Sequence, residues 1–326
     1  SSTIAAAGSE TSNSSVITRV DTHQKRAYND DISRPKFAIM DPELTKTLPD
    51  YQTESGCADI MMHTMERYFT NGGNMELTDA LAEGLLRTVM KNAVILHTDP
   101  ANYEARAEVM WAGSLSHNGL TGCGIARGDF MSHKLEHEMG GMFDVTHGAG
   151  LAALWPSWAR YVYKDCLPRF VRFARNVMGV TTDGTDEEIA LKGIDAMVDF
   201  YHSIGMPASF HELGIDPTDA QIDEMARRCL EACGSALGSA KKLDLDDMIA
   251  IYHAANQRIV HTDNGQINLF FFCKSHQFVK LHRTDIDTFC IFFNSRIARR
   301  TVDFVNFRTL CHFPCDRMLT SAAAND

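Results

Sequence analysis

The chain has 326 residues, of which 44% are apolar, so it can bury one large or two ordinary hydrophobic cores. Its formal net charge of −11 argues against a nucleic-acid-binding surface, and no stretch approaches the roughly 18 uninterrupted apolar residues of a membrane span. Nine cysteines without a repeated framework favour reduced thiols, and the N-terminus lacks the basic start and apolar core of a secretory signal, so we expect a cytoplasmic protein.

Residues 1–40 consist of short extended pieces separated by turns. Residues 16–18 and 37–40 are rich in β-branched and apolar side chains, and Pro35 and Pro42 mark the turns. We therefore predict strands at both places.

Residues 41–256 have a helical pattern. Between residues 78 and 96, apolar side chains recur at intervals of three and four. Further amphipathic runs cover residues 103–112, 148–163, 166–178, 187–204, 219–233 and 244–255. Carboxylates at 186–188 and a hydroxyl at Thr218 favour helix starts, whereas Gly205 and Gly214 favour helix ends. This section is predicted to be a mainly helical body.

Residues 257–326 differ in composition. They hold nine Lys or Arg against six Asp, a net charge of +3, and neither helical nor strand periodicity persists. The pair Cys311 and Cys315 has no second Cys or His pair at zinc-finger spacing. We predict a C-terminal tail and assign it no function.

Two short clusters carry side chains that bind metals. Asp59 and His63 are four residues apart, as are His133 and His137, and His147 follows. On a helix, each pair would share one face. Imidazoles together with a carboxylate suit a divalent transition ion that keeps one position open for a substrate.

The second cluster also permits a different interpretation. His133 to His137 has the H-x-x-E-H pattern of a group of zinc proteases, in which both histidines would hold zinc and Glu136 would activate water. That interpretation leaves the upstream Asp-His pair and His147 without a role. The protease is therefore the weaker alternative.

Three separated segments carry a family resemblance. They are FAIMDPELTKTLPDYQTESGCADIMMHTMERYFT, the histidine run, and HGAGLAALWP. Over residues 2–256 the chain resembles the group III metal-dependent, or iron-containing, alcohol dehydrogenases, in particular the butanol dehydrogenase and NADPH-dependent aldehyde reductase branch. The resemblance implies a mainly α fold, with residues 41–256 as a helical metal-binding domain like that of dehydroquinate synthase relatives. Residues 1–40 would be a residual α/β segment of the dinucleotide-binding domain.

The resemblance also implies roles for individual residues. Four would be metal ligands for Fe²⁺ or Zn²⁺: Asp59, His63, His133 and His147. His137 would line the pocket beside the nicotinamide without binding the metal, and Glu136 would be an ordinary carboxylate on the helix surface. The implied reaction interconverts a primary alcohol and an aldehyde with NAD or NADP.

The cofactor side of such an enzyme is only partly represented. Thr3 and Lys25 match positions that border the nicotinamide half of the cofactor in relatives, but no Gly-rich phosphate-binding turn is present. We therefore expect a chain truncated at its N-terminus, and a metal-binding fragment without catalytic activity is the alternative. Relatives often dimerise through the missing domain, so a homodimer is a further possibility.

Overall fold

The computed structural model describes residues 4–22, 24–234 and 238–257, and four short strands beyond them. Thr3 and the pair Cys311 and Cys315 lie outside the described residues. The chain separates into two units, Ser1–Arg258 and Ile259–Asp326. In the second unit, two antiparallel strand pairs are described: β3 (Gln266–Ile267) with β6 (Thr284–Asp285), and β4 (Phe270–Phe272) with β5 (Phe278–Lys280).

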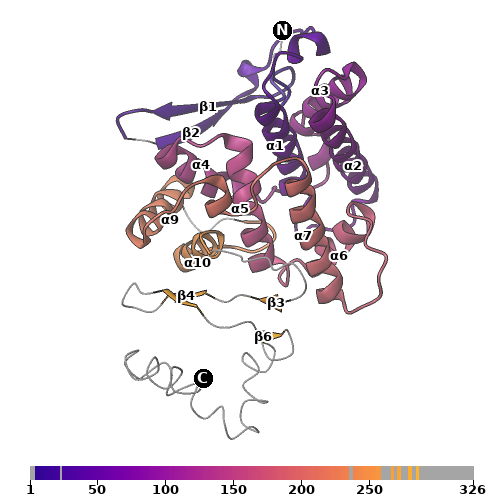
Figure 1. Ribbon diagram of the computed structural model, residues 1–326. Coiled ribbons are helices and arrows are strands. Elements are labelled where there is room, and N and C mark those ends of the chain that lie inside the picture. Colours follow the sequence, from indigo (N-terminus) through magenta and orange to yellow (C-terminus); the bar gives the residue numbers. More distant parts are fainter. Residues whose placement is uncertain are drawn as a thin grey trace, which may run out of the picture. The chain divides into compact units, whose positions relative to one another are not determined.

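The first unit begins with an antiparallel hairpin. Its strands are β1 (Ser14–Arg19) and β2 (Gln24–Asn29), and Figure 1 shows them projecting beside the helices. The strand predicted at residues 16–18 is confirmed, but the one at 37–40 is wrong, because this segment has no regular structure. A strand needs a hydrogen-bonding partner, and β1 and β2 pair only with each other within the described residues. Two short 3₁₀ helices follow, η1 (Asp31–Ser33) and η2 (Pro42–Thr45).

The remainder of the first unit is helical, as predicted. The helices are α1 (Asp50–Tyr68), α2 (Glu76–Thr98), α3 (Tyr103–His117), α4 (Met131–Phe143), α5 (His147–Val162), α6 (Leu167–Asn176), α7 (Asp186–Ser203), α8 (Phe210–Leu213), α9 (Asp219–Cys233) and α10 (Leu245–Ala255), with a short η3 (Leu120–Gly122). Thr185 and Thr218 start α7 and α9 with reciprocal capping boxes. Gly205 and Gly214 end helices at positive φ, which glycine adopts without strain.

Helix α5 lies at the centre of the packing and contacts α1, α4, α8 and α10. Its glycines allow a close approach, because a Cβ on Gly148 would lie 1.9 Å from the carbonyl oxygen of Ser55 in α1. The backbone N–H of Ala149 then donates to the Ser55 hydroxyl at 3.1 Å. The small residues of HGAG therefore determine how near α5 comes to α1.

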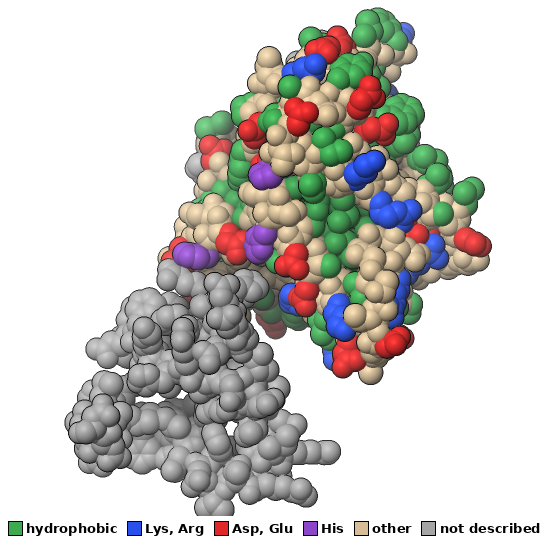
Figure 2. Space-filling view, turned by 45° about the vertical axis from the view of Figure 1, so that its right-hand side comes forward, with side chains coloured by type: hydrophobic (Ala, Val, Ile, Leu, Met, Phe, Trp, Pro, Cys, Tyr) green, Lys and Arg blue, Asp and Glu red, His purple; other side chains and the backbone are tan. Residues whose placement is uncertain are grey.

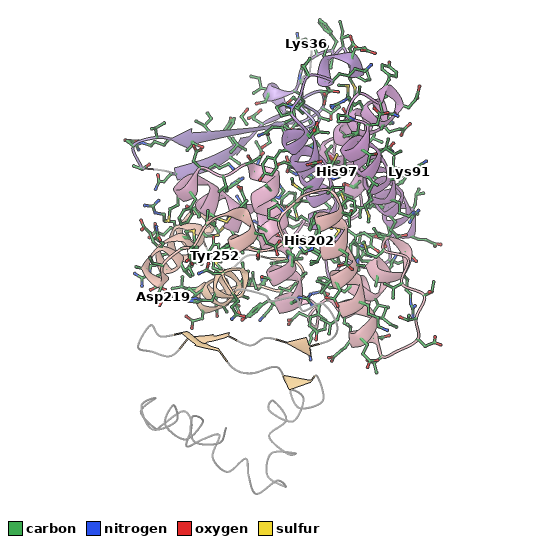
Figure 3. The ribbon with its side chains drawn as sticks, viewed as in Figure 1. Lys36, Lys91, His97, His202, Asp219 and Tyr252 are labelled. Carbon is green, nitrogen blue, oxygen red and sulfur yellow. The ribbon has the colours of Figure 1, made fainter. Side chains whose placement is uncertain are left out.

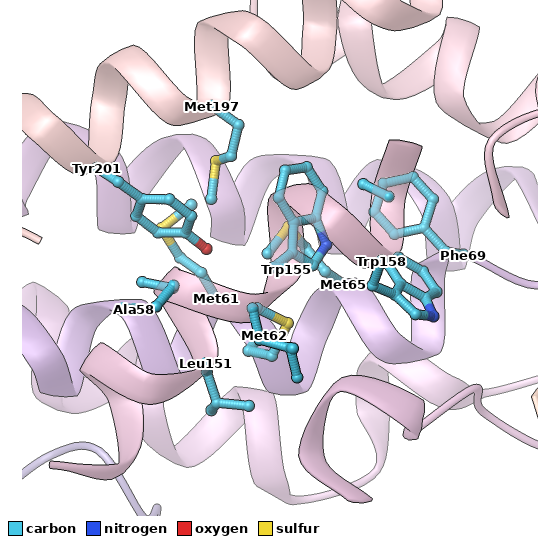
Figure 4. Packing of buried hydrophobic residues seen from close by; sticks show 14 of the residues in the cluster. Ala58, Met61, Met62, Met65, Phe69, Leu151, Trp155, Trp158, Met197 and Tyr201 are labelled. Carbon is cyan, nitrogen blue, oxygen red and sulfur yellow. The ribbon is translucent and has the colours of Figure 1, made fainter. Parts of the chain in front are cut away.

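The core is filled by large side chains from α1 and α5. Trp155 and Trp158 are buried beside Phe69, which stacks on Phe170 with ring centroids 4.3 Å apart (Figure 4). Methionines of α1, among them Met61, Met62 and Met65, fill the space around them and are fully buried.

Helix α4 is fixed at its start and in its middle. The Asp129 carboxylate accepts the backbone N–H of Met131 at 3.1 Å and those of Ser239 and Ala240. The hydroxyl of Tyr252, labelled in Figure 3, donates to the Leu135 carbonyl at 2.7 Å. These bonds hold the helix that carries the histidine run.

The outer surface is mixed in charge. On the face shown in Figure 2, acidic side chains occur among the basic and hydrophobic ones. Among the described residues, no helix has the length and hydropathy needed to cross a membrane.

Candidate metal centre

Three helices bring the four predicted ligands together. Asp59 and His63 lie one turn apart on α1. His133 lies in the first turn of α4, and His147 is the first residue of α5. The Asp59 Oδ1 atom is 3.4 Å from Nε2 of His63, 3.4 Å from Nε2 of His133 and 3.7 Å from Nε2 of His147. The Nε2 atoms of His63 and His133 are 3.2 Å apart.

These separations fit a tetrahedrally coordinated ion. An ion bound at about 2.1 Å keeps its ligand atoms roughly 3.4 Å from one another. Oδ1 of Asp59 is buried, and no hydrogen bond reaches it from the described residues. A buried carboxylate oxygen without a donor is costly. A cation among these four atoms would remove that cost, so the residues present fit a divalent metal.

Two further carboxylates hold the imidazoles in the orientation that a metal requires. Glu66 accepts the backbone N–H of His133 at 3.0 Å, and its other oxygen contacts the Nδ1 of that ring. Glu136 contacts the Nδ1 of His147 in the same way. Because an ionised carboxylate only accepts hydrogen bonds, a bond to either carboxylate requires the proton on Nδ1, and the Nε2 atoms of both rings face Asp59.

The electrostatics of the cluster also favour a cation. Burial alone would lower the pKa of His133, but Glu66 and Asp59 outweigh it and raise this pKa to about 10. Burial, followed by the neighbouring His133, lowers the pKa of His63 well below its usual value. The cluster therefore favours positive charge at one point, and a metal ion can supply it in place of a proton.

Glu136 contradicts the sequence analysis. It is fully buried, not a surface carboxylate, and it lies between His147 and the Lys25 ammonium, which is 3.2 Å from Oε2. Burial would raise the pKa of Glu136, but His147 and Lys25 together hold it at about 2. The sequence alone does not reveal this burial, because it depends on the packing of β2 and α5 against α4.

His137 lies one turn beyond His133 and beside the cluster. Its ring centroid is 6.2 Å from that of His133 and 5.6 Å from that of His147. Burial lowers its pKa to about 3, so it is neutral near pH 7. Glu136, His137 and His147 form a second group of possible ligands, but Lys25 already supplies a cation there.

Sequence analysis missed two buried residues of this site. Glu66 stands seven positions after Asp59 and three after His63, so helical spacing could have placed all three on one face. His117 ends α3, and its ring centroid is 3.9 Å from that of His63. Only the packing of α3 on α1 reveals His117. His202, labelled in Figure 3, pairs with Glu212 at 2.9 Å and is not part of the cluster.

The comparison with protein families shows which family the chain belongs to. The model of the Fe-containing alcohol dehydrogenase family, C-terminal part, matches residues 53–256, which include all four candidate ligands. This chain belongs to the iron-containing alcohol dehydrogenase family. The resemblance noted in the sequence is thereby confirmed, including the butanol dehydrogenase and aldehyde reductase branch.

Individual relatives agree with this membership. Over 251 residues the chain is 37% identical to NADH-dependent butanol dehydrogenase A of Clostridium acetobutylicum, covering 77% of this chain and 64% of the relative. It is 32% identical to the NADPH-dependent aldehyde reductase YqhD of Escherichia coli, with 78% and 64% covered. The crystal structure of NADH-dependent butanol dehydrogenase A from Thermotoga maritima matches with 34% identity and a TM-score of 0.73, covering 78% and 65%. The chain thus spans less than two thirds of the length of these relatives.

Family membership and geometry both oppose the zinc-protease alternative. In that interpretation Glu136 would have to reach a water molecule between His133 and His137. In this alcohol dehydrogenase family member, Glu136 instead faces Lys25 and His147. The ligand atoms of Asp59, His133 and His147 converge without His137.

Proposed function

We propose that this chain forms the metal-binding and substrate-binding part of an NAD(P)-dependent alcohol dehydrogenase that interconverts a primary alcohol and an aldehyde. The observation that carries the proposal is the convergence of Asp59, His63, His133 and His147, drawn from α1, α4 and α5, on one point. Fe²⁺ and Zn²⁺ both suit three imidazoles and a carboxylate. The names of the relatives support the reaction class and the use of NAD or NADP.

The same proposal assigns roles to two sections of the chain. Residues 41–256 would form the helical catalytic domain, and residues 1–40 would belong to the dinucleotide-binding part. Residues 257–326 have no assigned role. A cytoplasmic location and a homodimer remain predictions.

The protein's own residues would position and dehydrate the reacting groups. When bound, the ion supplies Lewis acidity towards the substrate oxygen, and the nicotinamide supplies or accepts hydride. The four ligands hold their lone pairs towards one point, and Glu66 and Glu136 keep two of the rings from turning. The neutral His137 is placed to accept or return the alcohol proton. Lys25 and Thr3 would lie on the nicotinamide side.

The His137→Ala variant is expected to retain the metal and lose turnover. His137 lies outside the group formed by Asp59, His133 and His147, so metal content should stay at one ion per chain. Loss of a proton-transfer group should lower kcat by roughly a hundredfold to ten-thousandfold. Elemental analysis and steady-state kinetics measure the two effects, with His202→Ala as the control. Loss of metal from the His137→Ala protein would count against this assignment.

Cofactor binding separates an enzyme from a metal-binding fragment. We expect the metal-loaded chain to enhance the fluorescence of NADH or NADPH on titration and to reduce an aldehyde with it. A chain that binds one metal ion but causes no change in nicotinamide fluorescence would instead be the fragment.

A further inference from the structure

Glu136 occupies a space made for a carboxylate. The side chain is fully buried, and a Cβ on Gly140 would lie 2.5 Å from Oε1. Gly150 on α5 also leaves room, since its Cβ would lie 3.1 Å from the same oxygen. A buried carboxylate needs a compensating cation and hydrogen-bond donors. Lys25 and His147 both meet Oε2, so Glu136 is compensated from two different elements.

Two partners compete for the Nδ1 atom of His147, and the one that bonds to it determines which ring nitrogen carries the proton. The Lys25 Nζ atom is 3.2 Å from Nδ1 of His147 as well as 3.2 Å from Glu136. If the ammonium donated to Nδ1, the proton would sit on Nε2, and that nitrogen could not bind a metal. If Nδ1–H donates to Glu136, the Nε2 lone pair is free towards Asp59. A hydrogen bond to Glu136 therefore favours the tautomer of His147 whose Nε2 atom can bind a metal.

The residue that pairs with Glu136 comes from the β1–β2 hairpin, which is distant in the sequence. Lys25 lies in β2 and reaches inward, and its neighbour Arg26 pairs with Glu138 of α4 at 2.7 Å. Two consecutive residues of β2 are therefore ion-paired to the helix that carries His133. Only the first of them contacts a candidate metal ligand.

We propose that Glu136 is a positioning residue that holds His147 in its metal-binding tautomer, and that Lys25 compensates the buried charge of Glu136. The β1–β2 hairpin then affects how tightly the site holds its ion through Lys25, the residue of β2 that reaches Glu136 and His147. This inference rests on the proposed function, because it requires His147 to be a metal ligand.

The test is a Co²⁺ titration of the full chain, followed by chelator competition and by the visible absorption of the bound ion. Glu136→Ala should weaken Co²⁺ binding about tenfold to hundredfold, the usual cost of removing such an outer partner, and should change the absorption bands. Glu138→Ala is the matched control, since it breaks the neighbouring hairpin ion pair without touching His147, and it should stay within about twofold. Lys25→Met should weaken binding about threefold to tenfold, but not when Glu136 is already Ala.

The outcomes separate this inference from the proposed function. Equal losses in Glu136→Ala and Glu138→Ala, or no loss in Glu136→Ala, would overturn the inference. His147→Ala should lose tight Co²⁺ binding altogether, and unchanged binding there would overturn the proposed function as well. If the Ala variant does not fold, as judged by circular dichroism, Glu136→Met keeps a similar side-chain volume without a carboxylate or amide acceptor for the His147 Nδ1–H, and the same limits apply to it.

Discussion

Asp59→Asn is expected to weaken binding of a divalent transition ion roughly hundredfold to thousandfold, if about 10–16 kcal/mol of zinc binding is shared among four ligands. Asp59 contributes the only formal negative charge among the candidate ligands. Its Oδ1 atom lies 3.4–3.7 Å from the Nε2 atoms of the three histidines. The substitution preserves the shape of the side chain, so a loss of affinity would not arise from a cavity.

The control for this variant is Asp195→Asn. Asp195 is an exposed carboxylate of α7 that pairs with Arg160. Isothermal titration with Zn²⁺ measures both proteins, and the control should match the unmodified chain. Unchanged Zn²⁺ affinity in Asp59→Asn would show that the ion binds at a site that does not include Asp59.

Trp155→Ala is expected to lower the free energy of unfolding by about 3–5 kcal/mol, because it removes a large, fully buried side chain and leaves a cavity. Trp155 packs against Phe69, Phe173 and Tyr201, with centroid separations of 6.2, 6.0 and 6.5 Å. It therefore links α5 with α1, α6 and α7 and supports the helix whose first residue is His147.

An exposed tryptophan provides the control for this prediction. Trp111 in α3 is 55% exposed, so Trp111→Ala should change the free energy of unfolding by no more than about 0.5 kcal/mol. Urea denaturation followed by circular dichroism compares the two variants under one condition. Similar losses in both would mean that the core around α5 is not where stability is concentrated.

Much of this fold could be predicted because helices depend on nearby residues. The spacing of Asp59 and His63, and of His133 and His137, indicates two helix faces, and both pairs lie on helices. Capping residues such as Thr218 define helix starts with equally local chemistry.

What escaped prediction depends on contacts between distant elements. Residues 37–40 have the composition of a strand but no partner strand among the described residues. Glu136 appeared to be on the surface because the sequence does not reveal that Lys25 covers it. His117 joins the site only through packing of α3 on α1. The ligand set itself came from the family resemblance, since spacing alone left the zinc protease open.

The central claim is that one ion is held by Asp59, His63, His133 and His147. Elemental analysis combined with X-ray absorption spectroscopy of the Zn²⁺-loaded chain tests it most directly. We expect one zinc per chain, with three imidazole nitrogens and a carboxylate oxygen at about 2.0–2.2 Å. Sulfur in the coordination shell, fewer than three imidazoles, or no stoichiometric zinc would contradict the assignment.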